Sequence, residues 1–90
     1  MNVSTGVSVG DTSTLLLPAS SGRVYAVIVN DGSEPVYLAM TGGGAAVANS
    51  GVRLNADGGS YEINFLNQYV GAIYGITATS TSNVTVSASQ

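Results

Sequence analysis

The side chains best able to do chemistry in this sequence are four carboxylates that lie beside turns. Asp57 and Glu62 flank a pair of glycines, while Asp31 and Glu34 share an earlier turn. Paired carboxylates can act as general acid and base on sugars when a cleft holds them a few ångströms apart. The more usual role of Asp31 and Asp57 is that of a turn residue that hydrogen-bonds its own backbone. We favour this second interpretation.

The composition removes most other kinds of chemistry. The sequence has no His, Cys or Lys, so it lacks the side chains that commonly activate a Ser or Thr nucleophile, and neither a disulfide nor a zinc site is expected. The only cations are Arg23 and Arg53. Two arginines are too few to neutralise several phosphates, so we expect no nucleic-acid partner. The sequence predicts a protein that is not an enzyme and that holds no cofactor or metal.

The low charge favours a chain that belongs to an assembly. Charged residues make up 8% of the 90 residues, and the net charge is −3, whereas roughly a quarter of the residues in soluble domains are charged. A surface with so little charge tends to associate. The first residues lack the basic and apolar regions of a signal peptide, and polar residues interrupt every run that approaches the length of a membrane span. We therefore expect a soluble protein without a membrane partner.

The elements that must position these residues are β-strands. Apolar residues recur at every second position between clusters of Gly, Asn, Asp and Pro, and no helical period is sustained. This pattern predicts an all-β fold, a small antiparallel β-sandwich of about eight short strands with a jelly-roll or immunoglobulin-like topology. Residues 1–10 are expected to form an N-terminal arm or an edge strand, and residues 11–90 a single β-sandwich domain. The expected strands are 3–9, 12–17, 23–30, 36–40, 47–54 (irregular at 49–51), 60–66, 70–78 and 83–89.

Two of these strands, 23–30 and 36–40, are predicted to pair as a hairpin around the turn at Asp31-Gly32. Side-chain alternation then puts Tyr25, Val27 and Val29 on the core face. The opposite face is also apolar, and an exposed apolar face marks an interaction site. It supplies five candidate interface residues: Val24, Ala26, Ile28, Tyr37 and Ala39. The alternative is that segment 41–50 or the N-terminal segment covers this face within the same chain.

Three further residues are candidates for the interface. Tyr69 lies in a loop from which it can reach a partner, although a tyrosine at the edge of the core with a wet hydroxyl is the more usual arrangement. Arg23 and Arg53 are each expected to bind a carboxylate or several carbonyl groups. Their acceptors can come from Glu34, from Glu62 or from a neighbouring subunit.

The order of several motifs is similar to that of a known group of proteins. The motifs are Leu16-Leu17-Pro18-Ala19, Arg23, Asn30, Pro35-Val36-Tyr37, Gly51-Val52-Arg53-Leu54, Gly58-Gly59-Ser60 and Gly71-Ala72-Ile73-Tyr74. In this respect the chain, from about Thr12 to its end, resembles small virion-associated structural proteins of tailed bacteriophages. Residues 1–10 fall outside the pattern.

The resemblance implies a β-sandwich accessory protein on the exterior of a phage capsid, made in the host cytoplasm. Such a decoration or cement protein would bind the major capsid protein and its own copies and stabilise the shell. Because oligomers follow the symmetry of the site that they occupy, a homotrimer is the first expectation and a dimer the second. The alternative is an adhesin or carbohydrate-binding module at the tip of a tail or fibre, which would touch glycans through loop Tyr and Asn side chains.

Overall fold

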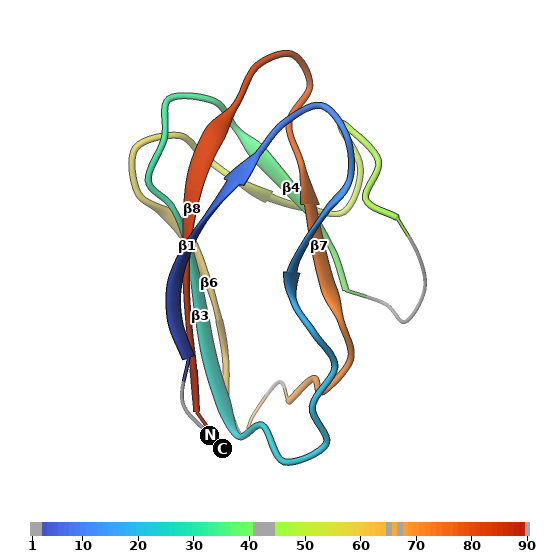
Figure 1. The fold of residues 1–90 in the computed structure, drawn as a ribbon, viewed down its shortest axis with the longest axis vertical. Helices are drawn as coiled ribbons and strands as arrows, with labels where there is room; N and C mark the ends of the chain where they lie inside the picture. Colours follow the sequence, from blue (N-terminus) through green and yellow to red (C-terminus); the bar gives the residue numbers. More distant parts are fainter. Residues whose placement is uncertain (1–2, 41–44, 65, 67, 90) are drawn as a thin grey trace.

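The computed structural model describes residues 3–40, 45–64, 66 and 68–89. In these ranges the chain forms eight antiparallel strands in two four-stranded sheets and no helix (Figure 1). The predicted small β-sandwich is therefore confirmed. The strands are β1 (Val3–Val9), β2 (Thr14–Leu17), β3 (Tyr25–Asn30), β4 (Val36–Ala39), β5 (Val52–Leu54), β6 (Gly59–Ile63), β7 (Ile73–Ile76) and β8 (Ser82–Ser89).

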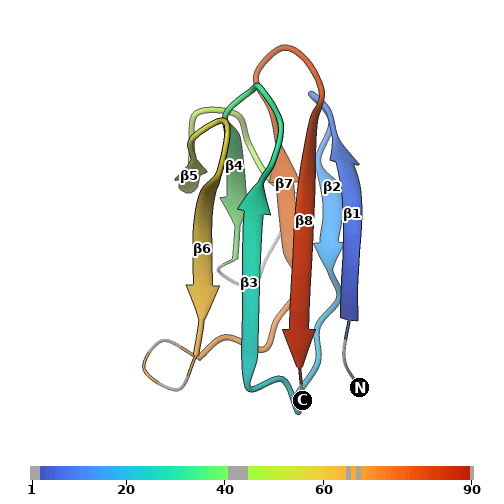
Figure 2. The same ribbon diagram turned by 90° about the vertical axis from the view of Figure 1, so that its left-hand side faces the viewer.

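The strand order is that of a jelly roll. One sheet, which we call sheet A, has the order β1-β8-β3-β6, and the other, sheet B, has the order β2-β7-β4-β5. Thus the first strand pairs with the last, the second with the seventh, the third with the sixth and the fourth with the fifth, as in a long hairpin rolled over on itself. Figure 2 looks onto sheet A, with sheet B behind it. Residues 3–9 of the N-terminal segment form the edge strand β1.

The core lies between the two sheets and is filled by alternate residues of each. Ile28, Val84 and Val86 from sheet A are fully buried, and they belong to one cluster with Leu38 and Ile73 from sheet B. Most of these side chains are β-branched, a type that packs well on a pleated surface. Each contributes roughly 1.5–3 kcal/mol through its removal from water. This burial is the main force that holds the two sheets face to face.

The predicted hairpin between residues 23–30 and 36–40 is wrong. β3 pairs with β8 and β6 in sheet A, whereas β4 pairs with β5 and β7 in sheet B. The turn at Asp31-Gly32 therefore carries the chain from one sheet to the other. Because the two sheets face each other, the even-numbered residues of both strands point into the core. Tyr25, which was expected there, is exposed.

A buried amide fixes this crossing. The side-chain nitrogen of Asn30 donates to the carbonyl oxygens of Glu34 at 2.6 Å and Leu54 at 3.2 Å. Its oxygen accepts hydrogen bonds from the backbone N–H of Gly32 and from the hydroxyl of Ser82. A Cβ at Gly32 would overlap Ser82, so the turn packs directly on the start of β8. Asn30 therefore joins β3, the crossing turn, β5 and β8.

Candidate functional site

The outer face of sheet B carries a second apolar cluster, which we call the sheet B patch. Side chains on this face follow from the strand register, which puts Tyr37 beside Arg53 and Ile76, and Tyr74 beside Ala39 and Leu15. The patch comprises Leu15, Tyr37, Ala39, Ala46, Val47, Ala48, Arg53, Tyr74 and Ile76. It is separated from the main core by the sheet itself, so it can contact other molecules.

The chain covers the centre of this patch with its own segment 45–50. Ala46 is buried against Tyr37 and Ile76, and its backbone N–H donates to the hydroxyl of Ser13 at 2.9 Å. The segment therefore crosses the outer face from β4 toward β2. One alternative was that segment 41–50 of the same chain covers this face. The described part of that segment, 45–50, supports this alternative for Tyr37.

The rim of the patch stays open to solvent. Leu15 is 45% exposed and Val47 is 63% exposed, and Tyr74, the partner of Leu15 on β7, is half-buried. The exposure of Leu15 has a local cause, because the register between β2 and β7 shifts between Leu15 and Leu17. This bulge turns both Leu16 and Leu17 inward, so the first leucine of the run is left outside.

Arg53 supplies a positive charge at one side of the patch. Its Cζ lies 5.9 Å from the centroid of the Tyr37 ring, at the outer limit of a cation–π contact. Its Nε donates to the side-chain oxygen of Asn55 at 3.1 Å. The guanidinium therefore lies over an aromatic ring at the surface, and its remaining donors are available to a partner. Arg53 was expected to bind Glu34 or Glu62, whereas the contacts that the described residues give it are with Tyr37 and Asn55.

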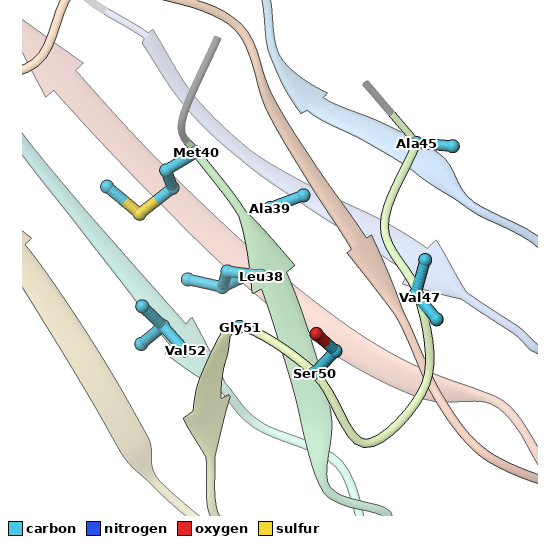
Figure 3. Close-up of a pocket in the computed structure, with 8 residues that line it drawn as sticks. All are labelled: Leu38, Ala39, Met40, Ala45, Val47, Ser50, Gly51 and Val52. Carbon is cyan, nitrogen blue, oxygen red and sulfur yellow. The ribbon is translucent and has the colours of Figure 1, made fainter. Parts of the chain in front are cut away.

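A small hollow adjoins the patch at the end of β4. It has a volume of about 260 Å³ and is lined by Leu38, Ala39, Met40, Ala45, Val47, Ser50, Gly51 and Val52. Figure 3 shows Leu38, Met40 and Val52 on one side of β4 and Val47 across from them. The lining contains no charged side chain. The hollow therefore offers shape and apolar contact to a partner and no group that could do acid–base chemistry.

Two of the predicted interface residues are in the core. Ala26 and Ile28 are completely buried between the sheets, so the prediction that they face outward is wrong. The cause is the wrong hairpin. The prediction treated β3 and β4 as neighbours in one sheet, and so assigned the core face of β3 from that of β4, although β4 belongs to the other sheet. Val24 is half-buried just before β3, and its N–H donates to the carbonyl oxygen of Ser89. Of the five candidates, Tyr37 and Ala39 lie on the outer face of sheet B.

Arg23 is a structural residue in the connection between β2 and β3. It is 1% exposed, and its guanidinium donates to the carbonyl oxygens of Pro18 at 2.6 Å, Tyr69 at 2.9 Å and Gly71 at 3.2 Å. Burial lowers the pKa of Arg23 from its ordinary value, and the nearby Tyr69 opposes this shift. Of the two expected kinds of acceptor, a carboxylate or several carbonyl groups, Arg23 binds the second, within its own chain. Because the side chain is enclosed, it is not available to a partner.

Tyr69 belongs to the same structural unit. Its ring packs against the main core, and its hydroxyl donates to the carbonyl oxygen of Ala72 at 2.9 Å. The neighbouring Gln68 donates to the carbonyl oxygen of Arg23. Tyr69 therefore closes its own loop at the edge of the core, and its hydroxyl already has an acceptor.

Asp57 and Glu62 lie outside the sheet B patch. Asp57 has a φ of 61°, and its N–H donates to the carbonyl oxygen of Gly32, so it is a residue of a tight turn. Glu62 is exposed on β6 in sheet A, opposite Val27 of β3. Among the residues that the structure describes, no three of His, Cys, Asp and Glu gather in a way that could hold a metal ion.

Sequence reasoning missed the exposed rim, Leu15 and Val47. Three consecutive leucines do signal an irregular strand, because regular alternation cannot bury them all, but the sequence does not show which one points outward.

The described residues form no helix with the length and apolar character needed to cross a bilayer. Comparisons with protein families, with curated proteins and with solved structures find no match.

Proposed function

We propose that this protein is a non-enzymatic structural component of a bacteriophage virion. In this proposal it decorates the capsid exterior, binds the major capsid protein and its own copies, and strengthens the shell. The observation that carries the proposal is the sheet B patch, an apolar outer face whose rim exposes Leu15 and Val47. The setting comes from the sequence alone, through the resemblance of its motif order to small phage virion proteins.

The patch is suited to binding a protein surface. A sheet face that is apolar on its outer side, with aromatic residues and an arginine, has the composition found at the centre of protein interfaces. Tyr74 and Leu15 stand side by side on neighbouring strands, and Arg53 offers guanidinium donors at the margin. Segment 45–50 already excludes water from the centre, so a partner needs to cover only the rim.

The fold is compatible with this role but does not decide it. Jelly rolls occur in viral capsid proteins and also in lectins, and a fold by itself does not determine function. What favours a shell protein over a sugar-binding one is the position of two tyrosines, Tyr37 and Tyr69, although Tyr25 is exposed at the start of β3. Tyr37 and Tyr69 are engaged in packing and in hydrogen bonds within the chain, so neither offers a free ring at a loop tip.

The number of copies per particle tests this proposal. Purified virions of the phage that encodes the chain are digested, and the chain is quantified by mass spectrometry against the major capsid protein. A decoration protein is expected at a fixed ratio to capsid subunits, in hundreds of copies. A few copies per particle would contradict shell decoration and would favour the tip of a tail or fibre. Absence from purified particles would contradict any virion role.

A second measurement tests the stabilising role. Particles from a deletion strain are heated beside wild-type particles, and DNA release is followed with an intercalating dye. Wild-type particles are expected to release DNA at a higher temperature, and added purified protein should restore the wild-type temperature. Equal release temperatures would show that the protein does not strengthen the shell.

A further inference from the structure

The four edge strands of the sandwich differ in how well they are protected from pairing with another chain. Natural sheets protect their edges with short strands, charged residues, prolines or bulges. β5 has three residues and carries Arg53, β6 carries Glu62, and β2 has four residues, a bulge and Pro18 after its last residue. Each of these three edges therefore has at least one recognised form of protection.

β1 has none of these devices. It is seven residues long, with the sequence VSTGVSV, and contains neither a charge nor a proline. Its register with β8 runs without a break from Val3 opposite Ala88 to Val9 opposite Ser82. Because β1 ends the order of sheet A, no strand in the described part of the chain pairs with its second side (Figure 2). An edge this long and regular is a template for another strand.

The free hydrogen-bonding groups of this edge can be assigned. The N–H of Asp31 donates to the carbonyl oxygen of Asn83, which continues the β3–β8 register, so the odd-numbered residues of β8 turn their backbone groups toward β3. The even-numbered residues of β8 then face β1, where they meet Thr5, Val7 and Val9. The backbone groups of Ser4, Gly6 and Ser8 therefore point away from the sheet.

We propose that two copies of this protein pair through β1, antiparallel and about a two-fold axis at Gly6, so that two sheets A become one continuous sheet. The sequence of β1 is nearly symmetric about this point. In this register Gly6 meets Gly6 of the second copy, Ser4 meets Ser8, and Thr5 meets Val7. The three outward-pointing residues of each copy then meet one another, and each such pair exchanges two main-chain hydrogen bonds.

The side chains also match in this register. Ser4 and Ser8 are exposed on the outer face of the sheet, where paired hydroxyls can hydrogen-bond to each other. On the side toward sheet B, Thr5 is exposed and Val7 is half-buried. In the dimer, Thr5 of each copy would be covered by Val7 of the other copy. The absence of side-chain charge on β1 means that no like charges oppose each other. The side chains of a second copy are therefore complementary to this edge.

This inference deepens the self-binding part of the proposed function, and it rests on that proposal only for its setting. Its test uses the isolated full chain, so it fails independently of any virion measurement. Sedimentation velocity over a wide range of concentration should show a dimer. A monomer at every concentration would overturn the pairing, as would a trimer, because a two-fold edge contact closes with two copies. Either result leaves the count of copies per virion unaffected.

Cysteine substitution tests the register. The chain has no cysteine, and Gly6 is the position that meets itself. A hydrogen-bonded antiparallel pair has a Cα separation of about 5.5 Å, within the range of a disulfide. Gly6→Cys should therefore form a disulfide-linked dimer under mild oxidation. Ser4→Cys is the matched control, since Ser4 of one copy lies several residues along the edge from Ser4 of the other. Cross-linking of Ser4→Cys in place of Gly6→Cys would overturn the register.

A charge at the same position should separate the copies. Gly6→Lys places two ammonium groups directly opposite each other, which is unfavourable between strands. The new Cβ would lie 3.4 Å from the side-chain oxygen of Asn83, an ordinary contact, so the variant is expected to fold. It should sediment as a monomer with an unchanged circular dichroism spectrum. Ser60→Lys, exposed on the far edge of the same sheet, should remain dimeric. A dimeric Gly6→Lys variant would contradict the proposal.

Discussion

Two buried polar side chains, Arg23 and Asn30, lie at opposite ends of β3 and tie the loops of the sandwich together. Arg23 donates to carbonyl oxygens in segments 18–22 and 69–71, and Asn30 joins the crossing turn to β5 and β8. A small domain without disulfides has few other ways to hold long connections. Both residues belong to the motifs on which the expectation of a phage protein rests, and in this structure their contacts are internal.

Replacing Arg23 by Lys should destabilise the fold although the charge is retained. A single ammonium group cannot reproduce the fork that reaches Pro18, Tyr69 and Gly71. Buried carbonyl groups left without donors lower the free energy of unfolding, and we expect a loss of about 2–4 kcal/mol. Urea denaturation measures the loss. Arg53→Lys is the matched control. If it lowered the free energy of unfolding as much as Arg23→Lys does, the structural role of Arg23 would be contradicted.

Replacing Asn30 by Asp tests the other end of β3. The two side chains have nearly the same shape, but a carboxylate oxygen would face the carbonyl oxygens of Glu34 and Leu54 in place of an N–H donor. A buried charge that meets acceptors alone is costly, so the free energy of unfolding should fall by about 3 kcal/mol or more. Thermal denaturation checks this.

The control for this substitution is Asn49→Asp. Asn49 is exposed in a turn with a φ of 65°, a conformation that Asp also tolerates. Its free energy of unfolding should change by no more than about 0.5 kcal/mol. If the two variants melted at the same temperature, the amide of Asn30 would not be the joint that the structure indicates.

At the scale of the elements, the sequence predicts the strands better than it predicts their partners. Period-two alternation and turn residues place seven of the eight strands within about three residues of their observed ends, and β1 agrees at both ends. The exception is the expected strand 47–54, of which only 52–54 forms a strand, β5. Turn chemistry at Asp31-Gly32 shows that the chain reverses. It does not show whether the reversal stays in one sheet or crosses to the other, because that depends on the long-range pairs β3–β8 and β4–β7.

The candidate site depended on this ambiguity. Ala26 and Ile28 were placed outside because they were assigned the opposite parity to the core residues of β4. For Arg23, one of the two expected kinds of acceptor, several carbonyl groups, is what the structure shows. Its place among the interface candidates does not agree with the structure, because its guanidinium is enclosed within the chain. Val47 could not be found at all from strand patterns, because segment 45–50 leaves the sheet and crosses its outer face. Such a crossing depends on tertiary contacts, and no pattern in the local sequence indicates it.

Substitution of two glycines near β5 separates the cost of backbone strain from the cost of steric overlap. Gly51 and Gly58 both have positive φ, 90° and 116°. A Cβ at Gly51 would overlap the carbonyl oxygen of Leu38, whereas a Cβ at Gly58 meets nothing within 4 Å. Gly58→Ala should therefore cost about 1–2 kcal/mol of strain alone. Gly51→Ala should cost about 1–3 kcal/mol more, because β4 must also move.

Guanidinium denaturation of both variants measures this difference. The slope of the free energy of unfolding against denaturant should stay the same, so that the midpoints report stability directly. An equal loss in both variants would show that β4 yields to the added methyl group. In that case the turn before β5 would be held by backbone conformation alone.

At the scale of the whole molecule, the proposed contacts use different parts of the sandwich. Self-pairing uses the β1 edge of sheet A, while capsid binding uses the outer face of sheet B, with Leu15 and Val47 at its rim. The two contacts do not compete for the same residues. A dimer would therefore present two sheet B patches, and binding of both to one particle would raise the overall affinity well above that of a single contact.

Leu15→Asp should weaken binding to the particle without weakening the fold. Leu15 is half-exposed, so its loss removes little from the folded chain, but burial of an aspartate against a partner loses the apolar contact and strands a charge. A loss of roughly 1.5–3 kcal/mol per contact corresponds to at least tenfold weaker binding. Purified variants are titrated onto particles that lack the protein. Ser60→Asp adds the same charge to the exposed face of sheet A and should bind like the wild type.

The ionic strength of this titration separates apolar from electrostatic docking. The chain carries few charges, and binding through the sheet B patch depends mainly on apolar burial, so added salt should hardly weaken the wild type. If Leu15→Asp and Ser60→Asp lost affinity equally and added salt restored both, the loss would come from net charge. If salt restored neither, it would come from another face. If Leu15→Asp bound as tightly as the wild type, the rim of sheet B would not be the surface that meets the capsid, and the proposed docking face would be wrong.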